Sequence, residues 1–103
     1  MKVSKRKKLE DAGWKVGTAD EFLELSDEEA AYIEMKLALS KTLKRERIKK
    51  KLSQTDLARM IASSQSRVAK MESADSSVSI DLLLRSLLTL GVPRSRVAKA
   101  FAA

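Results

Sequence analysis

Cysteine and histidine are absent from this 103-residue chain, which also has only three glycines and one proline. Without cysteine no disulfide can form, and without either residue the usual zinc ligand sets are excluded. The lack of histidine also removes the commonest general base. The glycines form no phosphate-binding loop, and acidic pairs such as Glu28-Glu29 are explained by helix starts. We therefore predict neither an enzyme nor a cofactor or metal site.

Long apolar runs are missing as well. No stretch approaches the length that a membrane-spanning helix needs. The N-terminus is basic, but no apolar segment of the signal-peptide type follows it. The composition therefore predicts a soluble cytoplasmic protein without a membrane partner.

Charge of one sign predominates. Lys and Arg number 21 against 14 acidic residues, which gives a formal net charge of +7. This balance favours a polyanionic partner, with nucleic acid the first candidate. Apolar residues make up 44% and aromatic residues only 4%, so the core of one small domain should be mainly aliphatic.

The most informative stretch runs from Leu52 to Glu72 and predicts two short helices joined by a tight turn. Ser53 is an N-cap candidate with Asp56 three residues on. Ser64 can cap a second helix from Gln65 to about Ser73. Apolar side chains recur at helical spacing in both segments.

The outward face of the second helix is small, polar and basic, and it carries no acid. Gln65 is at its tip, followed on this face by Ser66, Ala69, Lys70 and Ser73. Thin side chains, a glutamine and cations are what a helix needs to enter the DNA major groove. The alternative is an ordinary amphipathic helix pair.

Glu72 lies next to the apolar side of this helix, where an unpaired carboxylate would be costly. Arg47 extends the row of Leu39 and Leu43 on the preceding helix and is therefore also core-facing. We predict an ion pair between Arg47 and Glu72. The alternative is a frayed Glu72 that faces water.

On these residues, positions 39 to 90 resemble the Cro/CI (XRE-type) helix-turn-helix family. The matching residues are Ser53-Gln54, Asp56-Leu57-Ala58, Ser64-Gln65-Ser66 and Val68 with Met71-Glu72. The resemblance implies an all-α, lambda repressor-like bundle of about five helices. It also implies that Gln54 contacts a phosphate, that Gln65, Ser66 and Lys70 read base edges, and that Arg47 pairs with Glu72.

The chain departs from the family pattern in three places. Ala62 replaces the usual glycine, so the turn must avoid positive φ or carry strain. Ser63 replaces an aliphatic residue. Neither the common glycine nor the common proline occurs between Ser73 and Ser79.

Further helices are predicted on both sides of this motif. The first runs from about Asp27 to Lys50, with two apolar stripes; Tyr32, Met35, Leu39 and Leu43 form one, and Ile33 and Leu37 the other. Ser79 should cap a helix with Leu82, Leu83, Leu87 and Leu90 inward, ended by Gly91. Pro93 should open a final helix with Val97, Ala98 and Phe101 on one side. The domain is thus assigned to residues 27–103.

Residues 1–26 are assigned to an N-terminal extension. Its basic arm, Met1 to Lys8, would follow DNA phosphates or remain a solvated tail. The strand-like Gly13-Trp14-Lys15-Val16-Gly17 would pair with its copy, pair with another protein, or pack Trp14 on the core. Thr18 and Glu21 form a capping box for a short helix.

These features predict a sequence-specific transcriptional regulator, a repressor that binds double-stranded DNA as a homodimer. Ser53, Gln54 and Ser64 should hold the backbone, with Arg67 or Ser73 near phosphates. The alternative is a protein similar to HigA-type antitoxins, which bind a RelE/HigB-like toxin and repress their own operon. Residues 1–26 or the long helix would then hold the toxin. A phage-type repressor without a toxin is a third interpretation.

Overall fold

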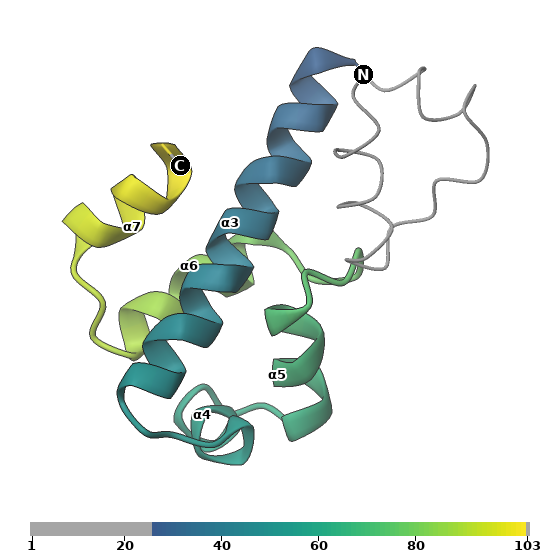
Figure 1. The fold of residues 1–103 in the computed structure, drawn as a ribbon. Coiled ribbons are helices and arrows are strands. Elements are labelled where there is room, and N and C mark those ends of the chain that lie inside the picture. Colours follow the sequence, from purple (N-terminus) through teal and green to yellow (C-terminus); the bar gives the residue numbers. More distant parts are fainter. Residues whose placement is uncertain (1–25, 103) are drawn as a thin grey trace.

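The computed structural model describes residues 26–102. They form five α-helices and no strand: α3 (Asp27–Lys49), α4 (Gln54–Met60), α5 (Gln65–Glu72), α6 (Ile80–Thr89) and α7 (Arg94–Ala102) (Figure 1). This confirms the predicted all-α bundle of about five helices. The basic arm, the strand-like segment at residues 13–17 and the capping box at Thr18 lie outside the described residues.

Four of the helices begin at a serine. The side chains of Ser26, Ser53, Ser64 and Ser79 each accept a hydrogen bond from the backbone N–H three residues on. Each hydroxyl satisfies one N–H that the first helical turn leaves without a partner. Helix α7 has no serine at its start: Pro93 directly precedes Arg94, and its carbonyl accepts from the N–H of Val97. Pro93 therefore occupies the cap and not the predicted first helical position.

The four internal helix ends share one backbone motif. Lys51, Ala62, Ala74 and Gly91 follow α3, α4, α5 and α6 with φ values of 59°, 54°, 55° and 88°. After α4, the N–H of Ser63 donates to the carbonyl of Ala58, and the N–H of Ala62 donates to that of Arg59. The same pair of bonds recurs at the other three ends, which makes each a Schellman motif. The turn with Ala62 thus keeps the positive φ without the glycine.

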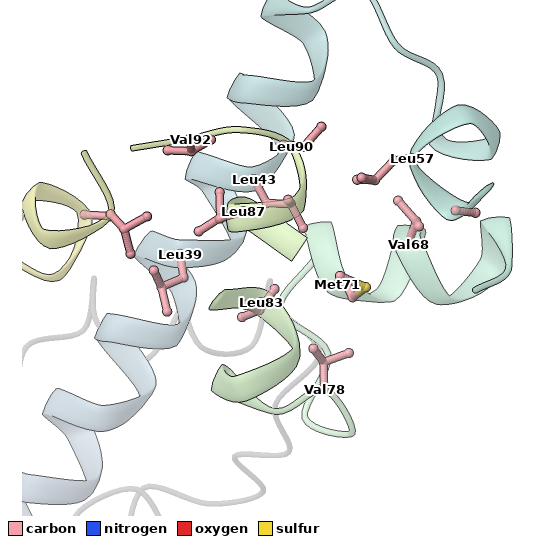
Figure 2. Close-up of a cluster of buried hydrophobic side chains, with 13 residues drawn as sticks. Leu39, Leu43, Leu57, Val68, Met71, Val78, Leu83, Leu87, Leu90 and Val92 are labelled. Atoms are coloured by element: carbon pink, nitrogen blue, oxygen red, sulfur yellow. The ribbon is translucent and has the colours of Figure 1, made fainter. Parts of the chain in front are cut away.

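Helix α3 is the centre of the bundle, and α5, α6 and α7 all pack against it. The core is built around fully buried side chains from four helices and one loop, with Leu39 and Leu43 of α3 at its centre (Figure 2). Around them lie Leu57, Val68, Met71, Val78, Leu83 and Leu87. The core is aliphatic, as the composition predicts.

Three side chains are less buried than other residues of their predicted stripes. Tyr32 is 49% exposed, whereas Leu39 and Leu43 of the same stripe are fully buried. On α7, Ala98 is exposed and Ala100 is buried. Ala100 is about 60° around the helix from Val97, whereas Ala98 is about 100° away. Leu82 is only partly buried, at the edge of the core.

Candidate DNA-binding surface

Helices α4 and α5 pack on each other and are joined by the turn from Ile61 to Ser64. A capping box fixes the start of α4. The Ser53 hydroxyl accepts from the N–H of Asp56 at 3.0 Å, and the N–H of Ser53 donates to the Asp56 carboxylate at 2.9 Å. This backbone hydrogen bond from Ser53 is the main reason why the pKa of Asp56 lies below its ordinary value. The charged form is therefore part of the cap.

Beneath the turn, Arg47 and Glu72 form an ion pair. The Nε of Arg47 is 2.6 Å from one Glu72 oxygen, and Nη2 is 3.0 Å from the other. Their side chains are only 11% and 3% exposed, so Glu72 is not a frayed residue. The hydrogen bond to Glu72 raises the pKa of Arg47. The third guanidinium nitrogen, Nη1, donates to the carbonyl of Leu52 at 2.7 Å, which ties the end of α3 to the start of α4.

Two glutamines extend this pair to the surface. Gln54 Nε2 donates to Glu72 Oε1 at 3.2 Å, and Gln65 Nε2 donates to Gln54 Oε1 at 2.7 Å. Gln54 is the first residue of α4 and Gln65 the first of α5. Sequence reasoning named all four residues but missed that they form one chain of hydrogen bonds. The available signal was that both glutamines directly follow an N-cap serine.

The remaining candidate residues lie at the surface along α5. Ser53, Ser64, Gln65, Ser66, Arg67, Lys70 and Ser73 are exposed, and Gln54 is partly buried. Several hydroxyls already have partners. Ser64 Oγ accepts from the N–H of Arg67 and lies 3.3 Å from Ser66 Oγ, while Ser73 Oγ donates to the carbonyl of Lys70. Gln65, Arg67 and Lys70 are thus the long side chains that this face offers to a ligand.

The exposed charges on this face are all positive. Glu72 is the only acid in α5, and it is buried. Arg67 and Lys70 form no ion pair within residues 26–102. Lys49, Lys50 and Lys51, all exposed, stand just before α4. Such a surface suits phosphates and base edges.

The loop after α5 holds a contact that sequence reasoning missed. The Asp75 carboxylate accepts from the N–H and the hydroxyl of Ser77 at 2.9 and 2.7 Å. The backbone bond from Ser77 lowers the pKa of Asp75. Lys36 of α3, whose pKa is lowered by burial, donates to the carbonyl of Ser76 at 3.4 Å. The Asp75–Ser77 bonds shape this loop, which lacks glycine and proline, and the Lys36 contact joins it to α3.

Within residues 26–102, no group of three or more acidic side chains is placed to hold a metal ion. None of the helices described there has the length and apolarity to cross a membrane.

Comparison with known protein families agrees with the arrangement of α4 and α5. A family model described as helix-turn-helix (HTH_3) matches residues 43–97, more than half of the chain, from the end of α3 to the start of α7. Neither the curated proteins nor the solved structures gave a significant match. The matched region contains the capped helix pair and its ion pair. The chain therefore belongs to the Cro/CI (XRE)-type helix-turn-helix family of DNA-binding transcription regulators.

Proposed function

We propose that this protein is a sequence-specific repressor that places α5 in the major groove and binds a two-fold operator as a homodimer. The observation that carries this proposal is the acid-free face of α5, with Gln65 held at its tip by Gln54. A helix that reads bases needs thin, uncharged or cationic side chains in a fixed register. Two such helices related by a two-fold axis would read an inverted repeat.

Each candidate residue then has a role. Gln65, Ser66 and Lys70 read base edges, while Arg67 and Ser73 approach phosphates. Ser53, Gln54 and Ser64 hold the DNA backbone together with the N-termini of α4 and α5. Gln54 also positions Gln65, because its Oε1 accepts the Gln65 amide N–H at 2.7 Å.

Selection of bound duplexes from a random DNA pool tests the proposal. We expect an enriched inverted repeat. On that site Gln65→Ala should weaken binding by about 1–3 kcal/mol, with little change on random DNA. Arg85→Ala, on α6, is the matched control and should leave both affinities unchanged. Equal losses for Gln65→Ala on both DNAs would refute its role in base reading.

The alternative function is that of an antitoxin that binds a RelE/HigB-like toxin and represses its own operon. It is supported by the resemblance of the segment at residues 13–17 to that of HigA-type antitoxins, and this segment lies outside the described residues. Co-expression with a small RelE-like protein encoded next to this chain tests it. A stable complex that loses the toxin when Trp14 is replaced by alanine is the expected result, and two proteins that purify separately would exclude it.

A further inference from the structure

Helix α3 has a face that the bundle leaves open along the length of the helix. Steps of four and three residues, repeated from Asp27 to Ile48, reach only side chains that are exposed or partly exposed. This is the heptad spacing of a helix that packs along a second helix. Ile48, which ends the series, is apolar and yet 55% exposed. We call this face the α3 stripe; its other members are Asp27, Ala31, Glu34, Ala38, Lys41 and Arg45.

The charge of the α3 stripe changes sign halfway along it. Asp27 and Glu34 lie in its N-terminal half, Lys41 and Arg45 lie in its C-terminal half, and Ala38 lies between them. Lys41 and Arg45 form no ion pair within residues 26–102, where the ion pairs join other residues. A helix with the same charges in reverse order would complement this face. A second copy of α3 that runs antiparallel is such a helix.

Helix α7 widens this contact surface. It forms the second wall of a groove of about 470 Å³ beside the α3 stripe, to which it contributes Lys99 and Ala100. Two apolar lining residues, Leu37 and Ala100, are only 6% and 7% exposed. Ala38 also lines the groove, and its single methyl group allows a second helix to approach closely. The acidic half of a second α3 would meet Lys99 there, in addition to the cations of the stripe.

We propose that two copies of this chain form the homodimer by packing their α3 stripes antiparallel, with the two-fold axis near Ala38. Residues at similar distances before and after Ala38 then face each other. Glu34 lies next to Lys41 of the partner subunit, and Asp27 lies near Arg45 of the partner subunit. The two-fold symmetry repeats both pairs. The homodimer of the proposed function, on which this inference rests, thereby gains a defined interface.

Such an interface leaves the candidate DNA-binding surface free. Figure 1 shows α7 and α5 on opposite sides of α3. Because the α3 stripe adjoins the groove with α7, a second copy packed there does not cover the exposed face of α5. Both copies can therefore present α5 to DNA.

Disulfide trapping tests the position of the axis and the direction of the pairing. The chain has no cysteine, so one introduced cysteine allows one cross-link between two copies. Ala38→Cys should give a disulfide-linked dimer under mild oxidation, because the two copies of residue 38 meet at the axis. Ala31→Cys, on the same stripe, is the matched control. It should stay unlinked, because its two copies would lie about 20 Å apart in an antiparallel pair.

Two results of the trapping would overturn the proposal. Linkage of Ala31→Cys as readily as Ala38→Cys would mean parallel pairing or random collision. An unlinked Ala38→Cys would mean that this face is not at a two-fold axis.

Charge reversal in the full chain tests the complementarity. Asp27→Lys with Glu34→Lys makes the charges of the α3 stripe all positive, and Lys41→Glu with Arg45→Glu makes them all negative. In sedimentation experiments each variant alone should dimerise roughly 100-fold more weakly than the unaltered chain, because like charges then face each other at both ends. An equal mixture of the two variants should dimerise again, because the positive stripe meets the negative one.

Asp81→Lys with Arg85→Glu, at exposed positions on α6, is the matched control and should dimerise like the unaltered chain. Equal helix content by circular dichroism would show that each variant is folded. A mixture that stays monomeric, or a reversed variant that dimerises fully by itself, would overturn this interface but not the homodimer. A monomeric unaltered chain would overturn both, whereas base reading by Gln65 is decided separately by the duplex selection.

Discussion

Glu72 accepts three hydrogen bonds, two from Arg47 and one from Gln54, with a side chain that is 3% exposed. A buried carboxylate of this kind is tolerated only while its partners are in place. Because those partners lie on α3 and α4, one residue of α5 holds three helices in register. The same carboxylate orients Gln54 and, through it, Gln65.

Removing the Glu72 carboxylate should therefore lower the stability of the fold. Glu72→Ala leaves the Arg47 guanidinium buried without its counterion, and we expect a loss of about 3–5 kcal/mol in the free energy of unfolding. Urea denaturation followed by circular dichroism measures it. Asp81→Ala is the control, because the Asp81–Arg85 pair is 73–78% exposed and should give no measurable change. Similar small effects for both variants would show that the buried pair is not structural.

The two carboxylates with lowered pKa values should make stability fall in acid. Asp56 and Asp75 both have pKa values below 3.8, mainly through backbone hydrogen bonds from Ser53 and Ser77. Their stabilising contribution is complete above about pH 3.8 and is lost as the pH falls through the lower folded-state values. Asp56→Asn should be less stable than the unaltered chain at neutral pH, with the difference shrinking in strong acid. Urea midpoints at several pH values measure this, and a constant difference would contradict it.

At the scale of helices, the four Schellman motifs show how a glycine-poor chain makes compact turns. Three of the four positions with positive φ hold a residue with a Cβ, namely Lys51, Ala62 and Ala74. The left-handed conformation costs an L-residue roughly 1–2 kcal/mol. The hydrogen bonds of each motif and the packing of the helices on both sides offset this cost.

Restoring glycine at one of these turns should stabilise the protein. Ala62→Gly removes the strain at φ 54°, and we expect a gain of about 1 kcal/mol, reduced in part by the greater freedom of glycine in the unfolded chain. Ala31→Gly, at an exposed position inside α3, should instead cost about 1 kcal/mol. Thermal melts of the two variants should shift in opposite directions. A destabilised Ala62→Gly would show that strain at this turn is negligible.

At the scale of the whole molecule, the net charge of +7 is not spread at random. Lys49, Lys50 and Lys51 cluster at the end of α3, next to the start of α4. Because contacts to phosphates release counterions, these lysines should set the salt dependence of DNA binding and not its sequence preference.

Neutralising two of these lysines tests whether they set the salt dependence and not the sequence preference. Lys49→Gln with Lys50→Gln should weaken binding to all duplexes alike and reduce the slope of log K against log salt by about one for each lost phosphate contact. Arg85→Gln on α6 should leave the slope unchanged. Affinity titrations at several salt concentrations provide the comparison. A loss confined to the selected operator would mean that these lysines read sequence.

Much of the domain's structure could be predicted from the sequence, because the patterns that indicate it are local. The N-cap serines, the 3.6-residue apolar period and Gly91 mark the helix bounds closely, since each depends on neighbours within one or two turns. The partners Arg47 and Glu72 could also be inferred, because each stood on an apolar face where a lone charge would be costly. The exposure of Gln65, Ser66 and Lys70 followed from the same periodicity.

Other features depend on contacts between distant parts of the chain, and only the tertiary structure decided them. The link from Gln65 through Gln54 to Glu72 requires that two helix N-termini meet across the turn. The exposure of Tyr32 and the burial of Ala100 depend on which faces of α3 and α7 the other helices cover. Lys41 of α3 and Lys99 of α7 line the same groove only because α7 packs back on α3. Local patterns fix each helix, whereas the packing of helices fixes which of their faces remain free to bind.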